Sequence, residues 1–274
     1  MHIFTDIHIY NCKWEQLGCG TAIPSLALFA YLLAGGQFSS SSLSSEQSPA
    51  NAKPNIRFTF ADYNSTVLRL VTMPNLLLTW KLACNRRNRK QNETVQNQQQ
   101  NQQDEDGEQD INPTMLNDFE KDLQQRGILI DFVSGAWSPE FVHMAIDSVS
   151  TASCVSAEDA ADTRQLASSR SRCRLLVLAS ETIYAPASLT TFSETLIALL
   201  RVGTSDNGTT NQQTSPPPSS RALLAAKKVY FGVGGGIDEF LTVLNRVRGG
   251  TGTVQQRSEV KTEGVGRVIL EISF

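Results

Sequence analysis

The stretch Leu17-Gly18-Cys19-Gly20-Thr21 decides the fold class. A possible first strand, Ile7 to Leu17, precedes it, and a helix expected to start near Pro24 follows it. Strand, glycine turn and helix in this order are typical of the first unit of a doubly wound α/β fold, where the turn lies against a ligand. Ile23 stands where a dinucleotide fingerprint needs its third glycine, which argues against a bound pyrophosphate. An ordinary strand-to-helix turn is the alternative.

The rest of the patterned sequence alternates strands with helices. Ile56, Phe58 and Phe60 alternate with polar residues before Asp62, which predicts a strand. Short, nearly continuous apolar runs typical of buried parallel strands lie at Ile128 to Val133, Leu175 to Ala179 and Ala222 to Ala226. Helical spacing at steps of three and four follows the last two runs, at Leu189, Phe192 and Leu196 and at Ile237, Phe240, Leu241 and Leu244. Arg267 to Phe274 alternates again and predicts an added strand. We therefore expect a doubly wound, mostly parallel α/β sheet with its ligand at the carboxyl ends of the strands.

Four polar, low-complexity stretches interrupt this pattern, at about 39–54, 85–113, 149–172 and 203–220. Their composition is typical of disordered loops. The remaining residues amount to one domain of ordinary size. We therefore expect a single domain over 1–274 in which the inserts interrupt one core.

Charge and cysteine usage exclude several classes of protein. The 24 Lys and Arg against 27 Asp and Glu give a net charge of -3, which excludes a polybasic binder of nucleic acid or membranes. Five scattered cysteines without a Cys-x-x-Cys pair, and three histidines without ligand spacing, argue against a metal site and favour a reducing compartment. The apolar run Ala22 to Ala34 is too short to span a bilayer. A short basic run at 86–90 is usually only solvated, with nuclear import or RNA contact as the alternative.

Asp62 closes the second predicted strand, where a carboxylate can hydrogen-bond both hydroxyls of a ribose. It follows Gly20 by 42 residues, against about 20 in an ordinary nucleotide fold, and the serine-rich insert accounts for most of the difference. A helix cap is the alternative interpretation.

The strand-end motifs resemble those of the seven-strand S-adenosylmethionine-dependent methyltransferases, and specifically the protein-histidine methyltransferase family. The matching segments are Gly18–Thr21, Asp62–Asn64, Val71–Asn75, Phe132–Trp137, Ser180–Tyr184, Ala226–Gly236 and Ile269–Phe274. The resemblance implies a seven-strand Rossmann-like sheet, S-adenosyl-L-methionine as cofactor, and methylation of a histidine ring nitrogen in a protein, with a large-subunit ribosomal protein as target. It further implies a cytoplasmic and nuclear monomer without direct nucleic-acid or membrane binding.

The resemblance also implies where the cofactor binds. Cofactor contacts are expected at Gly18, Cys19, Gly20, Asp62, Tyr63, Asn64, Gly135, Trp137 and Ser180. Asp62 is expected to hold the ribose and Trp137 to cover the adenine. Packing in the core is the alternative for Trp137.

Three residues are expected to form the catalytic part of the site. Glu181, after the fourth strand, is placed to accept one N–H of the target imidazole, which fixes the tautomer that presents its lone pair to the methyl group. Tyr184 and Tyr230 are expected to wall the acceptor pocket. A buried cap or an ion pair is the alternative for Glu181, and core packing is the alternative for each tyrosine. The imidazolium form of histidine has a pKa of about 6.5, so most of the side chain is neutral near pH 7 and offers a lone pair. No strong base is therefore needed.

The glycine-rich turn Gly232–Gly236 is not a phosphate loop, because Lys227 and Lys228 precede the glycines instead of following them. We expect it to approach the substrate backbone or the cofactor closely, with plain turn geometry as the alternative.

Two residues depart from the family pattern. Gln16 stands where an acid would contact the methionine end of the cofactor, and Ala136 stands where an acid would pair with the adenine amino group. The chain also begins almost at the turn, so a truncated start is expected. Two other functions stay open: a protein-lysine methyltransferase of the same fold, and a non-catalytic remnant that keeps a protein-binding surface.

Overall fold

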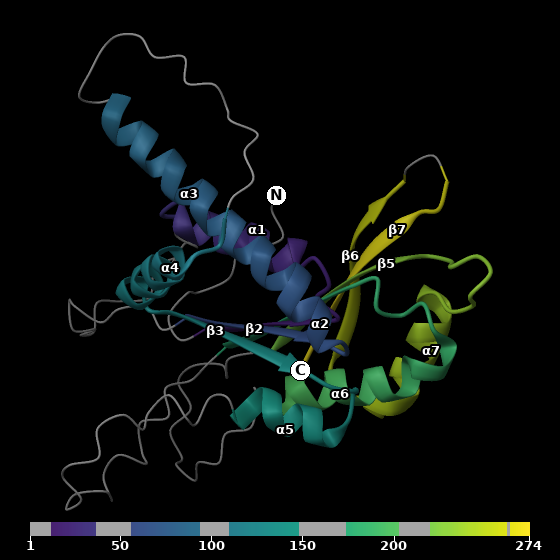
Figure 1. Ribbon diagram of the computed structural model, residues 1–274. Coiled ribbons are helices and arrows are strands. Elements are labelled where there is room, and N and C mark those ends of the chain that lie inside the picture. The colour runs from purple at the N-terminus through teal and green to yellow at the C-terminus, as the bar shows by residue number, and fades with distance from the viewer. Residues whose placement is uncertain (1–11, 37–55, 94–109, 148–173, 203–219, 262–263) are drawn as a thin grey trace, which may run out of the picture.

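A seven-stranded sheet in the order β3-β2-β1-β4-β5-β7-β6 forms the centre of the computed structural model, which describes residues 12–36, 56–93, 110–147, 174–202, 220–261 and 264–274 (Figure 1). The strands are β1 Cys12–Leu17, β2 Ile56–Asp62, β3 Ile128–Ser134, β4 Arg174–Ser180, β5 Arg221–Lys227, β6 Thr253–Val260 and β7 Arg267–Ser273. The first five are parallel, and β7 runs antiparallel to both β5 and β6. The predicted doubly wound, mostly parallel seven-strand sheet is confirmed.

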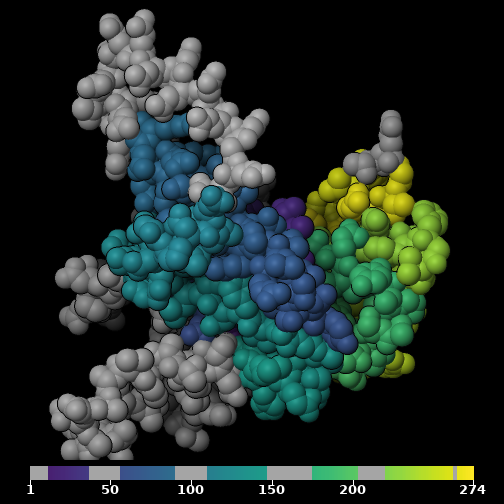
Figure 2. All heavy atoms as spheres, viewed as in Figure 1, coloured from purple at the N-terminus to yellow at the C-terminus, as the bar shows by residue number. Residues whose placement is uncertain are grey.

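Helices cover both faces of the sheet (Figure 1). One face carries α1 Ile23–Leu33, α3 Met73–Glu93 and α4 Pro113–Arg126, and the other carries α5 Pro139–Asp147, α6 Leu189–Val202 and α7 Ile237–Arg248. Three short turns, α2 Ser65–Val67, the π-helical η1 Leu68–Thr72 and the 3-10 turn η4 Pro186–Ser188, complete the connections. In the space-filling view, α3 and α4 lie side by side (Figure 2).

A separate apolar layer fills each side of the sheet, because the side chains of a strand alternate between its faces. On the α1 side, the ring of Phe58 in β2 meets Trp14 of β1 and Phe29 of α1 edge-on, at centroid distances of 4.7 and 5.8 Å. On the other side, Phe192 of α6 lies 6.2 Å from Phe240 of α7. Full burial of each such side chain contributes about 2 kcal/mol. This two-sided burial explains why β4 and β5 are nearly continuous apolar runs in the sequence.

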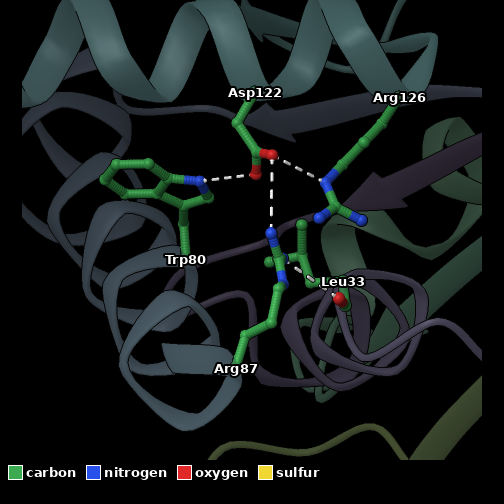
Figure 3. Close-up of polar contacts among 5 residues, drawn as sticks. All are labelled: Leu33, Trp80, Arg87, Asp122 and Arg126. Carbon is green, nitrogen blue, oxygen red and sulfur yellow. Dashed lines mark hydrogen bonds and ion pairs between the residues drawn. The ribbon is translucent and has the colours of Figure 1, made fainter. Parts of the chain in front are cut away.

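Asp122 of α4 fastens α4 to α3 (Figure 3). Its carboxylate accepts hydrogen bonds from Trp80 Nε1 at 2.9 Å and from Arg126 Nε at 3.0 Å. Arg87 Nη1 lies 3.8 Å from the same carboxylate, and Arg87 Nη2 donates to the carbonyl oxygen of Leu33 at the end of α1. The mostly buried carboxylate therefore joins α4 to α3, and Arg87 extends the connection to α1.

The predicted insert at 85–113 is wrong at its start, because α3 continues to Glu93 and residues 85–93 are helical. The polar composition that suggested a loop belongs to the solvent side of a helix whose Arg87 is anchored to Asp122. The inserts predicted at 39–54 and 149–172 lie outside the described residues, and so does the insert predicted at 203–220 except for Ser220, which is buried directly before β5 and accepts the backbone N–H of Phe274.

Strand β6 was not recognised in the sequence. Its residues are mostly exposed, because β6 is the edge strand of the sheet, so the alternation of apolar residues that marks the other strands is weak. A bulge between Gln256 and Ser258 interrupts its pairing with β7.

The continuous helical segment Ser65–Arg89 has the length and hydropathy of a membrane span. Its Leu76, Leu77 and Trp80 are buried within the domain, against the sheet and α4. A core helix of an α/β domain passes the same test of length and composition, so this property alone does not indicate a membrane protein.

Glu15 is an acid buried in the middle of the sheet, in β1. Its only charged neighbour within an ion-pair distance among the described residues is Lys13, whose Nζ lies 4.0 Å from its carboxylate. Burial raises the pKa of Glu15 to about 7, and the charge of Lys13 lowers it only in part.

Candidate functional site

The carboxyl ends of β1 to β5 meet at one edge of the sheet, which brings the predicted site residues together. Leu17 at the end of β1 pairs in register with Ala61 of β2 and with Ala179 of β4. The loops that follow these strands therefore start at the same level, as expected for a ligand site of a doubly wound fold. These loops carry two groups of residues, one around Asp62 and one around Glu181.

The glycine turn after β1 has left-handed backbone at both of its glycines, Gly18 with φ 59° and Gly20 with φ 49°. A β-carbon on Gly18 would lie 2.8 Å from Cγ2 of Thr182, so this glycine is required by the close approach of the β4 loop. A β-carbon on Gly20 would have no atom within 4 Å. The turn is thus packed on one side and faces open space on the other.

Asp62 holds the glycine turn directly. Its Oδ2 accepts the backbone N–H of Gly20 at 3.0 Å, and its Oδ1 accepts the backbone N–H of Asn64 at 3.0 Å. The backbone N–H of Gly135, after β3, donates to the carbonyl oxygen of Asp62 at 3.2 Å. The helix-cap alternative for Asp62 is wrong, since the side chain that caps α2 is that of Asn64, which accepts from Thr66 N.

The segment Val71–Asn75 supports the same turn from the other side. Thr72 Oγ1 donates to the carbonyl oxygen of Gly20 at 2.7 Å, and Asn75 Nδ2 donates to the carbonyl oxygen of Thr21 at 3.2 Å. Thr72 Oγ1 also lies 3.5 Å from Sγ of Cys19. Burial raises the pKa of the Cys19 thiol to about 11, so Cys19 is a packed, protonated thiol.

Trp137 and Tyr63, two predicted cofactor contacts, differ in how far they are buried at this edge of the sheet. Trp137 packs edge-on against Phe141 and Phe192, at centroid distances of 5.0 and 6.1 Å, so the core-packing alternative is observed for this ring. Its outer edge also reaches the turn, 4.0 Å from where a β-carbon of Gly18 would stand. Tyr63 is 74% exposed beside Asp62.

Glu181 belongs to the second group of residues. It follows β4, directly after Ser180, and its φ of 58° is left-handed, which is uncommon for a residue with a side chain. Its backbone N–H donates to the carbonyl oxygen of Ala225 of β5 at 2.9 Å, and this bond helps fix the turn. The carboxylate lies 3.5 Å from Nε of Arg267 in β7, and its side chain stays 40% exposed. The ion-pair alternative for Glu181 is therefore observed, and the carboxylate remains accessible.

The two predicted tyrosines lie beside Glu181. The Tyr230 hydroxyl lies near the Glu181 carboxylate, and burial together with this carboxylate raises the pKa of Tyr230. The backbone N–H of Lys227 donates to the same hydroxyl at 3.3 Å. The rings of Tyr184 and Tyr230 stand 6.4 Å apart with a tilt of 60°. Tyr230 is buried and Tyr184 is exposed, so together they form one wall that reaches from the core to solvent.

Gln16 has a local role in the structure. Its Oε1 accepts the backbone N–H of Ser25 at 3.2 Å, close to the start of α1. Ala136 is exposed after β3 and brings no polar group to this edge.

Sequence reasoning missed two residues that complete the site. Arg267 is paired with Glu181 across the sheet, although more than eighty positions separate them in the chain. The alternation in the last strand predicted β7 but not which strand it would join. Thr72 lies in a motif that carried the family resemblance, and a hydroxyl in a helical turn gave no signal of its hydrogen bond to Gly20.

Two curated proteins named histidine protein methyltransferase 1 are similar to this chain. The one from Saccharomyces cerevisiae is 30% identical over 240 residues, covering 84% of this chain and 48% of that protein. The one from Schizosaccharomyces pombe is 30% identical over 255 residues, covering 93% of this chain and 55% of that protein. The chain spans about half the length of the curated relatives it matches. The resemblance to the protein-histidine methyltransferase family is thereby confirmed.

No family model matches the chain. Among solved structures, the CMeT domain of the citrinin polyketide synthase is 11% identical with a TM-score of 0.42, covering 95% of this chain and 46% of that chain. An rRNA methylase from Streptococcus thermophilus is 12% identical with a TM-score of 0.37, covering 99% of this chain and 93% of that chain. TM-scores below 0.5 do not establish a shared fold, so the fold is assigned from the order of the strands in the sheet.

Proposed function

We propose that this homologue of the histidine protein methyltransferases transfers a methyl group from S-adenosyl-L-methionine to a ring nitrogen of a histidine in a protein. A large-subunit ribosomal protein is the proposed target, as the family resemblance implies. The observation that carries the proposal is the convergence of Glu181, Tyr184 and Tyr230 next to the turn that Asp62 holds.

The residues around the glycine turn fit a nucleoside cofactor. Each carboxylate oxygen of Asp62 accepts one backbone N–H, which leaves a further acceptor site on each oxygen for a ribose hydroxyl. The space beside Gly20 is open. Thr182 Oγ1 is buried next to Gly18 without a hydrogen-bond partner among the described residues, so it can still bind a polar ligand atom.

The chemistry needs little from the protein beyond alignment. When bound, S-adenosyl-L-methionine supplies an electrophilic methyl group on a sulfonium sulfur. The lone pair of the acceptor nitrogen would take this methyl group, S-adenosylhomocysteine would leave as the neutral thioether, and the imidazolium so formed would release the proton of its second nitrogen to give methylhistidine. In-line positioning of this kind can supply several of the roughly 7 to 11 kcal/mol available from proximity.

Glu181 is suited to hold the acceptor ring. Its exposed carboxylate can accept the N–H of the second ring nitrogen, which leaves the first nitrogen with a free lone pair. The same negative charge stabilises the imidazolium as it forms. Arg267 pairs with this carboxylate, and Tyr230 lies near it.

Incubation with methyl-labelled cofactor and purified large-subunit ribosomal proteins tests the proposal. We expect label in one protein band and methylhistidine after its hydrolysis. Methyllysine instead of methylhistidine would support the lysine methyltransferase alternative. A folded chain that binds S-adenosylhomocysteine and transfers no label would contradict the proposed activity, whereas a folded chain that binds neither would support the non-catalytic remnant.

A further inference from the structure

The loop between β5 and α7 exposes large apolar side chains right beside the proposed reaction centre. Phe231 is 79% exposed and Val233 is 61% exposed, and Phe231 follows Tyr230 directly in the chain. In Figure 1 the connection from β5 to α7 projects at the right-hand side of the molecule. Exposed apolar side chains gathered at one place mark contact sites more often than those that are scattered singly.

The shape of this loop is fixed by hydrogen bonds and glycines. Val229 and Gly236 form an antiparallel bridge at its base, and Ile237 N donates to the carbonyl oxygen of Lys228 at 3.2 Å. Lys228 N in turn donates to the carbonyl oxygen of Gly266, just before β7. The loop is therefore closed at its base and joined to the sheet.

Glycines in the loop also allow it to pack closely against the loop that carries Glu181. Gly234 and Gly235 have φ values of 80° and 77°. A β-carbon on Gly235 would lie 2.8 Å from the carbonyl oxygen of Ile183, and one on Gly234 would lie 3.0 Å from Cγ of Pro186. This fixed shape holds Phe231 and Val233 in solvent, although an apolar side chain gains free energy by leaving it.

A hollow adjoins the base of the loop. A cavity of about 620 Å³ lies between α7 and the β6–β7 hairpin, and its lining includes Val229, Ile237, Leu241 and Val254. Val229 belongs to both the loop and this hollow. The hollow also has polar lining residues, among them Asp238 and Arg248, so it adjoins the loop at Val229 but does not extend the apolar surface of Phe231.

We infer that Phe231 and Val233 form the docking surface for the protein acceptor, and that they bind an apolar side chain next to the target histidine. The inference rests on the proposed function and adds to it how the acceptor is recognised. Its support is continuity, because the docking surface, the tyrosine wall and Glu181 lie on two loops that are packed together.

The test compares the wild type with the double variant Phe231→Ala/Val233→Ala, using purified large-subunit ribosomal proteins as the probe. Binding of the probe and methyl transfer to it are both measured, together with affinity for S-adenosylhomocysteine. We expect at least tenfold weaker probe binding and a correspondingly higher KM, with kcat and S-adenosylhomocysteine affinity unchanged. Phe231→Leu, which keeps an apolar side chain, should restore most of the binding.

Leu78→Ala is the matched control, since Leu78 is 48% exposed on α3. It should bind the probe as the wild type does. Unchanged binding in the double variant overturns the docking inference while methyl transfer by the wild type still supports the function. If the wild type binds the probe but transfers no methyl group to it, the proposed function is contradicted. The docking inference is then decided by whether the double variant binds the probe more weakly than the wild type. Failure of the wild type to bind, or a wild-type dimer that the double variant splits, overturns the inference.

Discussion

Asp62 accepts the backbone N–H of Gly20 at 3.0 Å, so the carboxylate that ends β2 holds the glycine turn that follows β1. The two strand ends are thereby locked together at the place where the cofactor is proposed to bind. A second carboxylate, Glu181, lies at the same edge of the sheet without contacting this turn in any described hydrogen bond. The two acids should therefore differ in what their removal changes.

Asp62→Ala should weaken binding of S-adenosylhomocysteine by about 1.5 to 3 kcal/mol, the range for hydrogen bonds to a charged group. This corresponds to roughly a tenfold to hundredfold higher dissociation constant in calorimetry. Asp62→Asn keeps one acceptor oxygen and should lose less. Asp118→Ala, at an exposed position of α4, is the control and should bind normally. Normal binding by Asp62→Ala would show that Asp62 only shapes the turn.

Glu181→Gln should leave cofactor affinity unchanged and lower the rate of methyl transfer by about tenfold to a thousandfold. Glutamine keeps the size of the side chain and a carbonyl acceptor but lacks the charge that stabilises the imidazolium. Single-turnover measurements with saturating cofactor give this rate. If Glu181→Gln and Asp62→Ala both weaken cofactor binding equally and spare turnover, Glu181 is a structural or cofactor residue.

Gly18→Ala should lower stability and cofactor affinity more than Gly20→Ala does. Both substitutions place a side chain on left-handed backbone, at a cost of about 1 kcal/mol. Only the β-carbon at position 18 meets another atom, Cγ2 of Thr182 at 2.8 Å, so only this variant must displace the β4 loop. Thermal unfolding and calorimetry with S-adenosylhomocysteine measure the difference. Equal effects would mean that the β4 loop yields freely.

Glu15 should make the chain less stable as the pH rises. Burial raises its pKa from 4.5 to about 7, so between these values the folded chain holds a proton that the unfolded chain has released. The contribution is most favourable below pH 4.5 and is lost as the pH rises through 7, a change of roughly 3 kcal/mol. The difference between the wild type and Glu15→Gln in urea unfolding at pH 5 and pH 8 isolates this term.

Asp122→Ala should lower the free energy of unfolding by about 1 to 3 kcal/mol, because Trp80 Nε1 loses its hydrogen-bond acceptor in a mostly buried place. Asp122→Asn keeps an oxygen that can accept from Trp80, so it should cost less. Glu120→Ala, exposed on the same helix, should change stability by less than about 0.5 kcal/mol. Denaturant unfolding compares the three variants, and equal stability of Asp122→Ala and Glu120→Ala would contradict the role given to Asp122.

The sequence predicted most of the sheet, because buried parallel strands are short apolar runs and the turns between them are marked by glycine. It predicted Asp62 and Glu181 as edge residues for the same reason, since both end apolar runs. Exposed segments were harder to predict than buried strands. β6 escaped notice because an edge strand shows little apolar alternation, and the polar end of α3 was mistaken for a loop because helix propensity and tertiary anchoring do not show in polarity.

Partnerships across the fold could not be predicted at all. Arg267 meets Glu181 only because β7 inserts beside β5, and the pairing order of strands is not written in their local pattern. Gln16 bonds the backbone near the start of α1, a contact that depends on the exact angle between β1 and that helix. The roles proposed for the site residues stay predictions that the variants above address.

The position of β7 bears on when, during synthesis, the edge of the sheet that carries the proposed reaction centre can form. β7 lies between β5 and β6, and both of these strands precede it in the chain. During translation the edge of β5 lacks its partner strand until Arg267–Ser273 has been made, because β6 reaches the sheet only through β7. The guanidinium that pairs with Glu181 arrives in the same event. The edge of the sheet that carries Glu181 is therefore completed only after synthesis has passed β7.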